Sequence, residues 1–137
     1  MAAATLDLAA DFYTRYPGEP VTFTARVAAA AATGSFTVQV GVPEGLSVDT
    51  AAGPEAAGQP EFAYAEGARY VLWTVPAGAL AAGARWEFRV SGTVAPTGAD
   101  VQLEVSALLQ FAGEAGAPQT RGLQIQVAAQ GRYLRYL

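Results

Sequence analysis

A chain of 137 residues fits a single domain that is long enough to bury its own hydrophobic core. It contains no cysteine and no histidine and carries a formal net charge of −4, which excludes disulfides and thiolate metal sites and makes a nucleic-acid partner unexpected. No apolar run approaches the roughly 20 residues of a membrane-spanning helix, so we expect no membrane insertion.

The first half of the chain alternates apolar and polar residues with a period of two, the pattern of half-buried strands. This alternation predicts strands over residues 5–12, 21–27 and 36–42, with a turn at 16–20 where Pro17 presets φ and Gly18 accepts positive φ. Leu46 and Val48 predict a short edge strand. Residues 50–60 carry no large apolar side chain, and we expect them to form the longest loop.

The second half continues the same alternation. Strands are predicted over residues 62–64, 71–75, 84–90, 101–109 and 123–127, and Leu80 in the 76–83 loop is expected to plug the core. Turn residues recur every eight to twelve positions, and no helix of ten or more residues is indicated. The chain therefore holds seven to nine short strands.

One polar and one apolar face per strand predicts two antiparallel sheets packed face to face, an all-β immunoglobulin-like sandwich. A closed β-barrel remains the alternative, because periodicity alone does not separate the two. The side chains expected in the core are Phe23, Val38, Val40, Trp73, Leu80, Trp86, Phe88, Leu103, Val105 and Ile125.

The residue types needed for catalysis are scarce. Without histidine or cysteine, the usual general base and the strongest nucleophile are missing, and the serines lie in or beside predicted strands. Asp7, Asp11 and Glu19 are candidates to converge at one end of the sandwich, but no Asp-x-Asp-x-Asp spacing supports a calcium loop. We expect no enzyme activity, no cofactor and no metal site.

The order of several short motifs resembles the bacterial conserved-repeat modules, which are immunoglobulin-like sandwiches found in tandem on large surface proteins. The matching features are Pro17-Gly18 before an alternating strand, Val42-Pro43-Glu44-Gly45-Leu46, the Trp73 strand, and Gly83 before the Trp86 strand. The resemblance covers roughly residues 12–128. The family's Asn-x-Gly turn after the second strand and its asparagine in a late strand are missing, because this chain contains no asparagine; Ala32-Thr33-Gly34 stands in place of the turn. Membership would imply a non-catalytic structural or adhesive module.

The last seven residues, GRYLRYL, resemble the entry to a domain of phage-tail and tail-like injection proteins. We therefore divide the chain into one sandwich domain, 1–130, and a linker or partner-contacting tail, 131–137. Tyr and Arg dominate interface hot spots. The candidate partner-binding residues are Arg132, Tyr133, Arg135 and Tyr136 in the tail, and Tyr13 and Tyr16 near the start.

Three functions fit these patterns. The first is a non-catalytic structural or protein-binding module of a larger bacterial surface or assembly protein, whose partner is another protein or a neighbouring domain. The second is the sandwich domain of a phage-tail-like or baseplate protein. The third is a carbohydrate-binding module, which would need Trp73 or Trp86 exposed for stacking. Open edge strands also allow self-association. The location would be the cell surface within an exported chain, and otherwise an intracellular assembly.

Overall fold

The computed structural model describes residues 4–30, 34–78, 80–112 and 118–128. Nearly all of this part of the chain is strand or the turns between strands. The elements are β1 (Ala4–Ala10), β2 (Thr14–Arg15), β3 (Pro20–Ala29), β4 (Phe36–Pro43), β5 (Thr50–Ala52), the 3-10 turn η1 (Glu55–Ala57), β6 (Glu61–Ala65), β7 (Ala68–Val75), β8 (Arg85–Thr93), β9 (Val101–Phe111) and β10 (Gln119–Val127).

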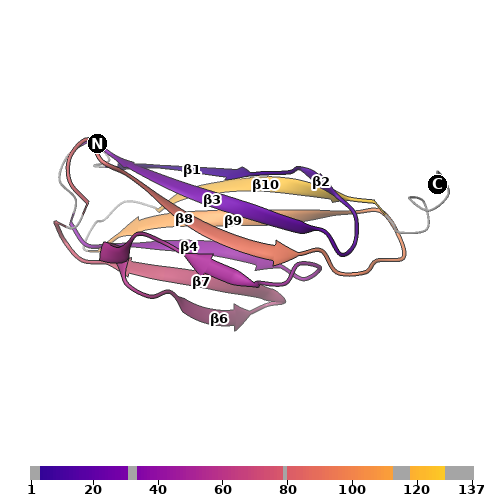
Figure 1. The fold of residues 1–137 in the computed structure, drawn as a ribbon. Helices are drawn as coiled ribbons and strands as arrows, with labels where there is room; N and C mark the ends of the chain where they lie inside the picture. Colours follow the sequence, from indigo (N-terminus) through magenta and orange to yellow (C-terminus); the bar gives the residue numbers. More distant parts are fainter. Residues whose placement is uncertain (1–3, 31–33, 79, 113–117, 129–137) are drawn as a thin grey trace.

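The strands form two sheets of unequal width. One has four strands in the order β1-β3-β8-β5, and the other has six in the order β2-β10-β9-β4-β7-β6. All pairings are antiparallel except that of β2 with β10, which is parallel. Both sheets keep free edges, so the chain is an immunoglobulin-like sandwich and the alternative of a closed barrel is wrong (Figure 1).

The core lies between the sheets and is built from the inward row of each strand. Trp73 on β7 and Phe88 on β8 meet across the two sheets with ring centroids 5.0 Å apart. Of the expected core residues, eight are fully buried: Phe23, Val38, Val40, Trp73, Leu80, Phe88, Val105 and Ile125. Trp86 and Leu103 differ from the expectation, because they are only partly buried and pack against the margin of the core.

The segment 46–60 differs most from its predicted structure. Leu46 makes only an isolated bridge with Val94, and the strand lies further on, as β5. The expected long loop instead contains β5 and η1, which close the seam between the sheets on this side. A Cβ at Gly53 would lie only 2.9 Å from Trp73 Nε1, and Ala57 of η1 is buried. Small residues let this segment lie directly on the core.

Ten strands are present in the described residues, against the seven to nine expected. One addition is β2, which lies between the strand predicted over residues 5–12 and the turn predicted at 16–20. Its backbone joins the far sheet through Gln126 N–H to the Tyr13 carbonyl, 2.9 Å, and Ala128 N–H to the Arg15 carbonyl, 3.2 Å. The N-terminal segment thus pairs first with β3 in one sheet and then with β10 in the other.

On the opposite seam, a side-chain amide covers the free edge of β1. Gln119 Oε1 accepts a hydrogen bond from Leu6 N–H at 3.1 Å, and its Nε2 donates to the Ala4 carbonyl at 2.7 Å. Further along the same edge, Ala10 N–H donates to the Tyr13 hydroxyl at 3.1 Å. These bonds satisfy backbone groups that an edge strand otherwise offers to another chain.

Candidate protein-binding surface

Strand β6 forms the outer edge of the wider sheet, and all five of its residues are exposed. Phe62 and Tyr64 are each 65% exposed, the highest values among the large apolar side chains of the described residues. They pair in register with Val71 and Arg69 of β7, so both rings lie on the face that Val71 turns toward the core. Because the facing sheet is two strands narrower, no strand of that sheet in the described residues lies over the rings, although Val48 lies beside them. We call Phe62, Tyr64 and the backbone of β6 the β6 surface.

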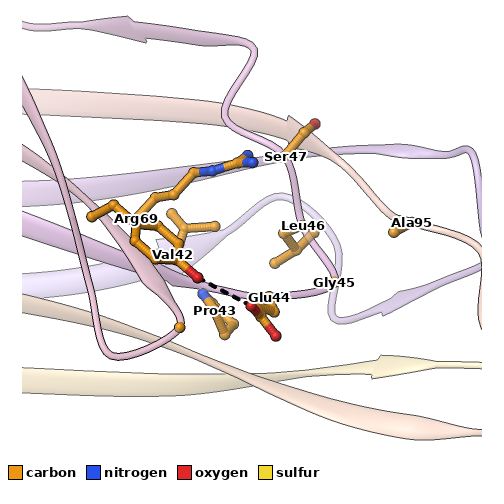
Figure 2. Close-up of a pocket in the computed structure, with 10 residues that line it drawn as sticks. Val42, Pro43, Glu44, Gly45, Leu46, Ser47, Arg69 and Ala95 are labelled. Atoms are coloured by element: carbon orange, nitrogen blue, oxygen red, sulfur yellow. Dashed lines mark hydrogen bonds between the residues drawn. The ribbon is translucent and has the colours of Figure 1, made fainter.

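A shallow hollow continues from the β6 surface toward the 43–47 turn (Figure 2). Its lining includes Val42, Pro43, Glu44 and Arg69, and it combines apolar carbon with one carboxylate and one guanidinium. The Tyr64 hydroxyl donates to Glu44 Oε1 at 3.2 Å, which holds the ring over the hollow. The mixture of aromatic, aliphatic and charged groups is typical of a protein-binding surface.

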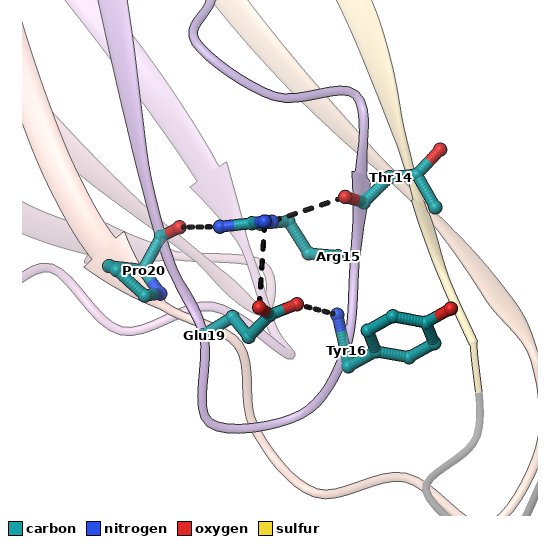
Figure 3. Close-up of polar contacts among 5 residues, drawn as sticks. All are labelled: Thr14, Arg15, Tyr16, Glu19 and Pro20. Carbon is teal, nitrogen blue, oxygen red and sulfur yellow. Dashed lines mark hydrogen bonds and ion pairs between the residues drawn. The ribbon is translucent and has the colours of Figure 1, made fainter. Parts of the chain in front are cut away.

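Phe12, Tyr13, Arg15 and Tyr16 form an aromatic–arginine cluster near the start of the chain. Polar groups of Arg15 and Tyr16 hold the turn that follows β2 (Figure 3). Arg15 donates from Nε to the Thr14 carbonyl at 3.1 Å and from Nη1 to the Pro20 carbonyl at 3.0 Å. Its Nη2 also lies 3.5 Å from Glu19 Oε2, and its guanidinium stacks over the Phe12 ring at 3.8 Å. The arginine therefore braces the chain between β2 and β3.

The two tyrosines expected to bind a partner in this region also have local roles. Tyr13 is half exposed, but its hydroxyl accepts the Ala10 N–H, while Tyr16 is partly buried and its backbone N–H donates to Glu19 Oε1 at 2.8 Å. Both stay predictions as partner-binding residues. The other four, Arg132, Tyr133, Arg135 and Tyr136, lie outside the described residues.

Several acidic residues form hydrogen bonds that hold the fold together. Asp11 Oδ1 accepts from Thr22 N–H at 2.8 Å, and Asp49 accepts from the hydroxyls of Ser47 at 2.7 Å and Thr93 at 2.6 Å. The bond from Thr93, and then that from Ser47, lowers the pKa of Asp49, which makes this carboxylate a weaker base. The Ser47 hydroxyl therefore donates a hydrogen bond to a carboxylate that is poorly suited to remove its proton.

Within the described ranges, no three metal-ligating side chains cluster, and no helix is long and apolar enough to cross a membrane. Trp73 is fully buried and cannot stack on a sugar, so the carbohydrate-binding alternative loses one of its two tryptophans. Trp86 lies on the same inward row as Phe88, with ring centroids 6.4 Å apart. The most exposed aromatic pair of the described residues is Phe62 and Tyr64, which the sequence pattern predicts only as part of a short strand.

Comparison with known proteins supports the fold. No protein-family model and no curated protein matches the sequence. The chain is similar to the major pilin subunit BcpA of Bacillus cereus, with a TM-score of 0.66 and 10% identity over 92% of this chain and 40% of that one. It is also similar to the major pilin SpaA of Corynebacterium diphtheriae, with a TM-score of 0.60 and 13% identity over 82% of this chain and 34% of that one. The chain therefore spans less than half the length of either pilin.

An enzyme shares the same architecture. AvmM, which catalyses macrocyclization in alchivemycin A biosynthesis, matches with a TM-score of 0.50 and 13% identity over 92% of this chain and 89% of that one. At such identities the likeness concerns the fold alone. The pilin neighbours do not support the resemblance of the tail to phage-tail proteins. SpaA is described with stabilizing isopeptide bonds, whereas this chain has no lysine to supply a side-chain amine for such a bond.

Proposed function

We propose that this chain is a non-catalytic module of a larger bacterial protein and that it binds a protein partner through the β6 surface. The pilin neighbours support the modular part, because each is a bacterial surface subunit of which a sandwich like this one makes up a fraction. The single observation that carries the binding part is the pair of exposed rings, Phe62 and Tyr64, on an open strand edge.

The non-catalytic part rests on residue chemistry, since the fold itself also serves an enzyme. The 137 residues contain no histidine and no cysteine, and several acids of the described chain, such as Asp11 and Asp49, are engaged in hydrogen bonds that hold turns and strands. Glu87 illustrates this: it accepts from Arg26 Nε at 2.8 Å and also binds Arg89, which lowers its pKa and fixes it as an ion-pair partner. A general base needs the opposite, a carboxylate whose pKa is raised toward neutrality.

The binding part rests on the energetics of exposed rings. An aromatic side chain left in water forgoes the free energy of its own burial, and an exposed apolar patch rimmed by polar residues marks an interaction site when it is large. Tyrosine is among the residue types enriched at hot spots, and Arg69 next to Tyr64 adds a charged group at the rim. The unpaired strand edge also offers backbone hydrogen bonds to an added strand.

Site-directed photo-crosslinking in the cells that produce the chain tests this function. A photoreactive side chain replaces Tyr64 in one variant and Glu104, an exposed residue on β9, in a matched control. We expect a discrete protein adduct from position 64, its loss when Phe62→Lys is added, and no such adduct from position 104. Equal labelling from both positions would refute a β6 partner, and so would binding to a glycan panel that Tyr64→Ala abolishes.

A further inference from the structure

The hairpin turn between β6 and β7 determines which backbone groups of β6 face outward. Glu66 and Gly67 form a two-residue turn with φ values of 52° and 78°, which is the type I′ geometry. Such a turn closes on a pair, here Ala65 and Ala68, that exchanges both of its hydrogen bonds. The alternation then turns the N–H and C=O groups of Phe62 and Tyr64 away from β7. Within the described residues, no hydrogen bond is recorded to these four groups.

These groups are self-complementary. We infer that the partner of the β6 surface is a second copy of this chain, paired antiparallel through β6 about a two-fold axis at Ala63. In this register Phe62 of each copy lies opposite Tyr64 of the other. The two residues of each such pair exchange both hydrogen bonds, so all eight outward groups of the dimer are satisfied. This inference rests on the proposed function and names its partner.

The side chains agree with this register on both faces of the joined sheet. On the aromatic face, each Phe62 packs against a Tyr64, which is a favourable cross-strand pair, and Arg69 lies beside Tyr64 in the same row. On the other face, Ala63 meets Ala63 and leaves room for the approach of the strands. Glu61 of each copy lies opposite the uncharged Ala65, so no like charges are directly opposed.

No other strand at the end of a sheet in the described part of the chain carries two exposed aromatic rings. The edge of β1 is partly covered by Gln119 and Tyr13, β5 has three residues, and β2 has two. At 65% exposure, each of the four rings of the dimer offers on the order of 100–160 Å². Together they fall short of the roughly 1,200 Å² of a standard interface. The isolated chain should therefore associate weakly, and tandem or clustered copies should associate more strongly.

Cysteine cross-linking tests the register directly, because the chain has no native thiol. Ala63→Cys brings two thiols together at the axis, where the Cα atoms of a non-hydrogen-bonded pair are about 4.5 Å apart, within disulfide range. In Ala65→Cys alone or Glu61→Cys alone, the thiols of two copies are about 13 Å apart along the strands. When these last two variants are mixed in equal amounts, the thiol at position 61 of one copy lies opposite the thiol at position 65 of the other.

Under mild oxidation at equal concentration, we expect Ala63→Cys to form the covalent dimer at least about tenfold faster than Ala65→Cys or Glu61→Cys alone, because of these distances. The mixture should yield the heterodimer, and Phe62→Lys should slow dimerisation of Ala63→Cys to the control rate. Equal rates for all single-cysteine variants, or no heterodimer, would overturn the inference. A photo-adduct of Tyr64 to a different protein, with Ala63→Cys remaining monomeric, would overturn it while leaving the proposed function standing.

Discussion

Gly92 in β8 lies beside the backbone of the 46–49 segment, which runs along this strand. A Cβ built on Gly92 would lie 2.0 Å from the Ser47 carbonyl oxygen and 3.1 Å from its carbonyl carbon. Real Cβ atoms essentially never lie closer than 3.0 Å to such an atom. Gly92→Ala therefore forces the two backbones apart by about 1 Å, and because the obstacle is backbone, no side-chain rotation relieves it.

The segment that must move is tightly bound. Ser47 N–H donates to the Thr93 carbonyl at 3.0 Å, and Thr93 N–H donates to Ser47 Oγ at 3.0 Å. Losing both costs about 0.5–1.5 kcal/mol each, and the overpacking itself costs about 1–3 kcal/mol. We expect Gly92→Ala to lower the free energy of unfolding by about 2–6 kcal/mol, out of the roughly 5–15 kcal/mol of an ordinary domain.

Urea unfolding followed by tryptophan fluorescence measures this loss as a shift of the midpoint at constant slope. The matched control is Gly98→Ala, because a Cβ at Gly98 meets nothing within 4 Å and its φ lies outside the left-handed region. The control should stay within about 1 kcal/mol of the parent, or gain slightly. A Gly92→Ala protein as stable as the Gly98→Ala protein would show that the 46–49 segment moves away without loss of stability, and it would refute this account of the packing at Gly92.

The remaining predictions concern the core, the covered edge and pH. Trp73→Ala should cost about 3–5 kcal/mol because it empties a fully buried site, and Trp86→Ala should cost less because that ring is partly exposed; two denaturation curves compare them. Gln119→Ala leaves the Leu6 N–H and the Ala4 carbonyl of β1 unpaired, so it should cost about 1–3 kcal/mol and speed amide hydrogen exchange in β1. Gln119→Glu can still accept from the Leu6 N–H, so it should keep that amide protected from exchange while leaving the Ala4 carbonyl without its donor. The pKa values of Asp49 and Glu87 are lowered in the fold, so these carboxylates stabilise the protein above the pKa of an ordinary carboxyl group, and this stabilisation is lost as the pH falls below about 4. Melting curves recorded from pH 7 to 2 should therefore be less acid-sensitive for Asp49→Asn and Glu87→Gln. Unchanged acid sensitivity in both variants would contradict the lowered pKa values.

The period of two is enough to predict an all-β fold of half-buried antiparallel strands, although it does not separate a sandwich from a closed barrel. Val38 and Val40 alternate with polar neighbours, and that pattern places them on one face of a strand whatever the rest of the chain does. The same local reasoning placed Leu80 in the core as the one large apolar residue of its loop, and it is fully buried. These features depend on the nearest few residues, which is why the sequence reveals them.

The β6 surface illustrates what local pattern cannot determine. Phe62 and Tyr64 alternate in the same way as a buried row, and they do lie on the core-facing side of their sheet. Whether another sheet covers them depends on the sheets being six and four strands wide, which is a property of the whole topology. The role of Gly92 is equally non-local, because it depends on a carbonyl 45 positions earlier in the chain.

The parallel pairing of β2 with β10 has a mechanical consequence. Tension applied between the residues before β2 and those after β10 pulls the two strands in opposite directions along their length. The two backbone bonds that join them are then loaded together and must rupture at once, whereas a hairpin pulled from its open end unzips one bond at a time. The pairing of β2 with β10 therefore resists stretching of the sandwich. It is the first pairing of the wider sheet that such a force would load.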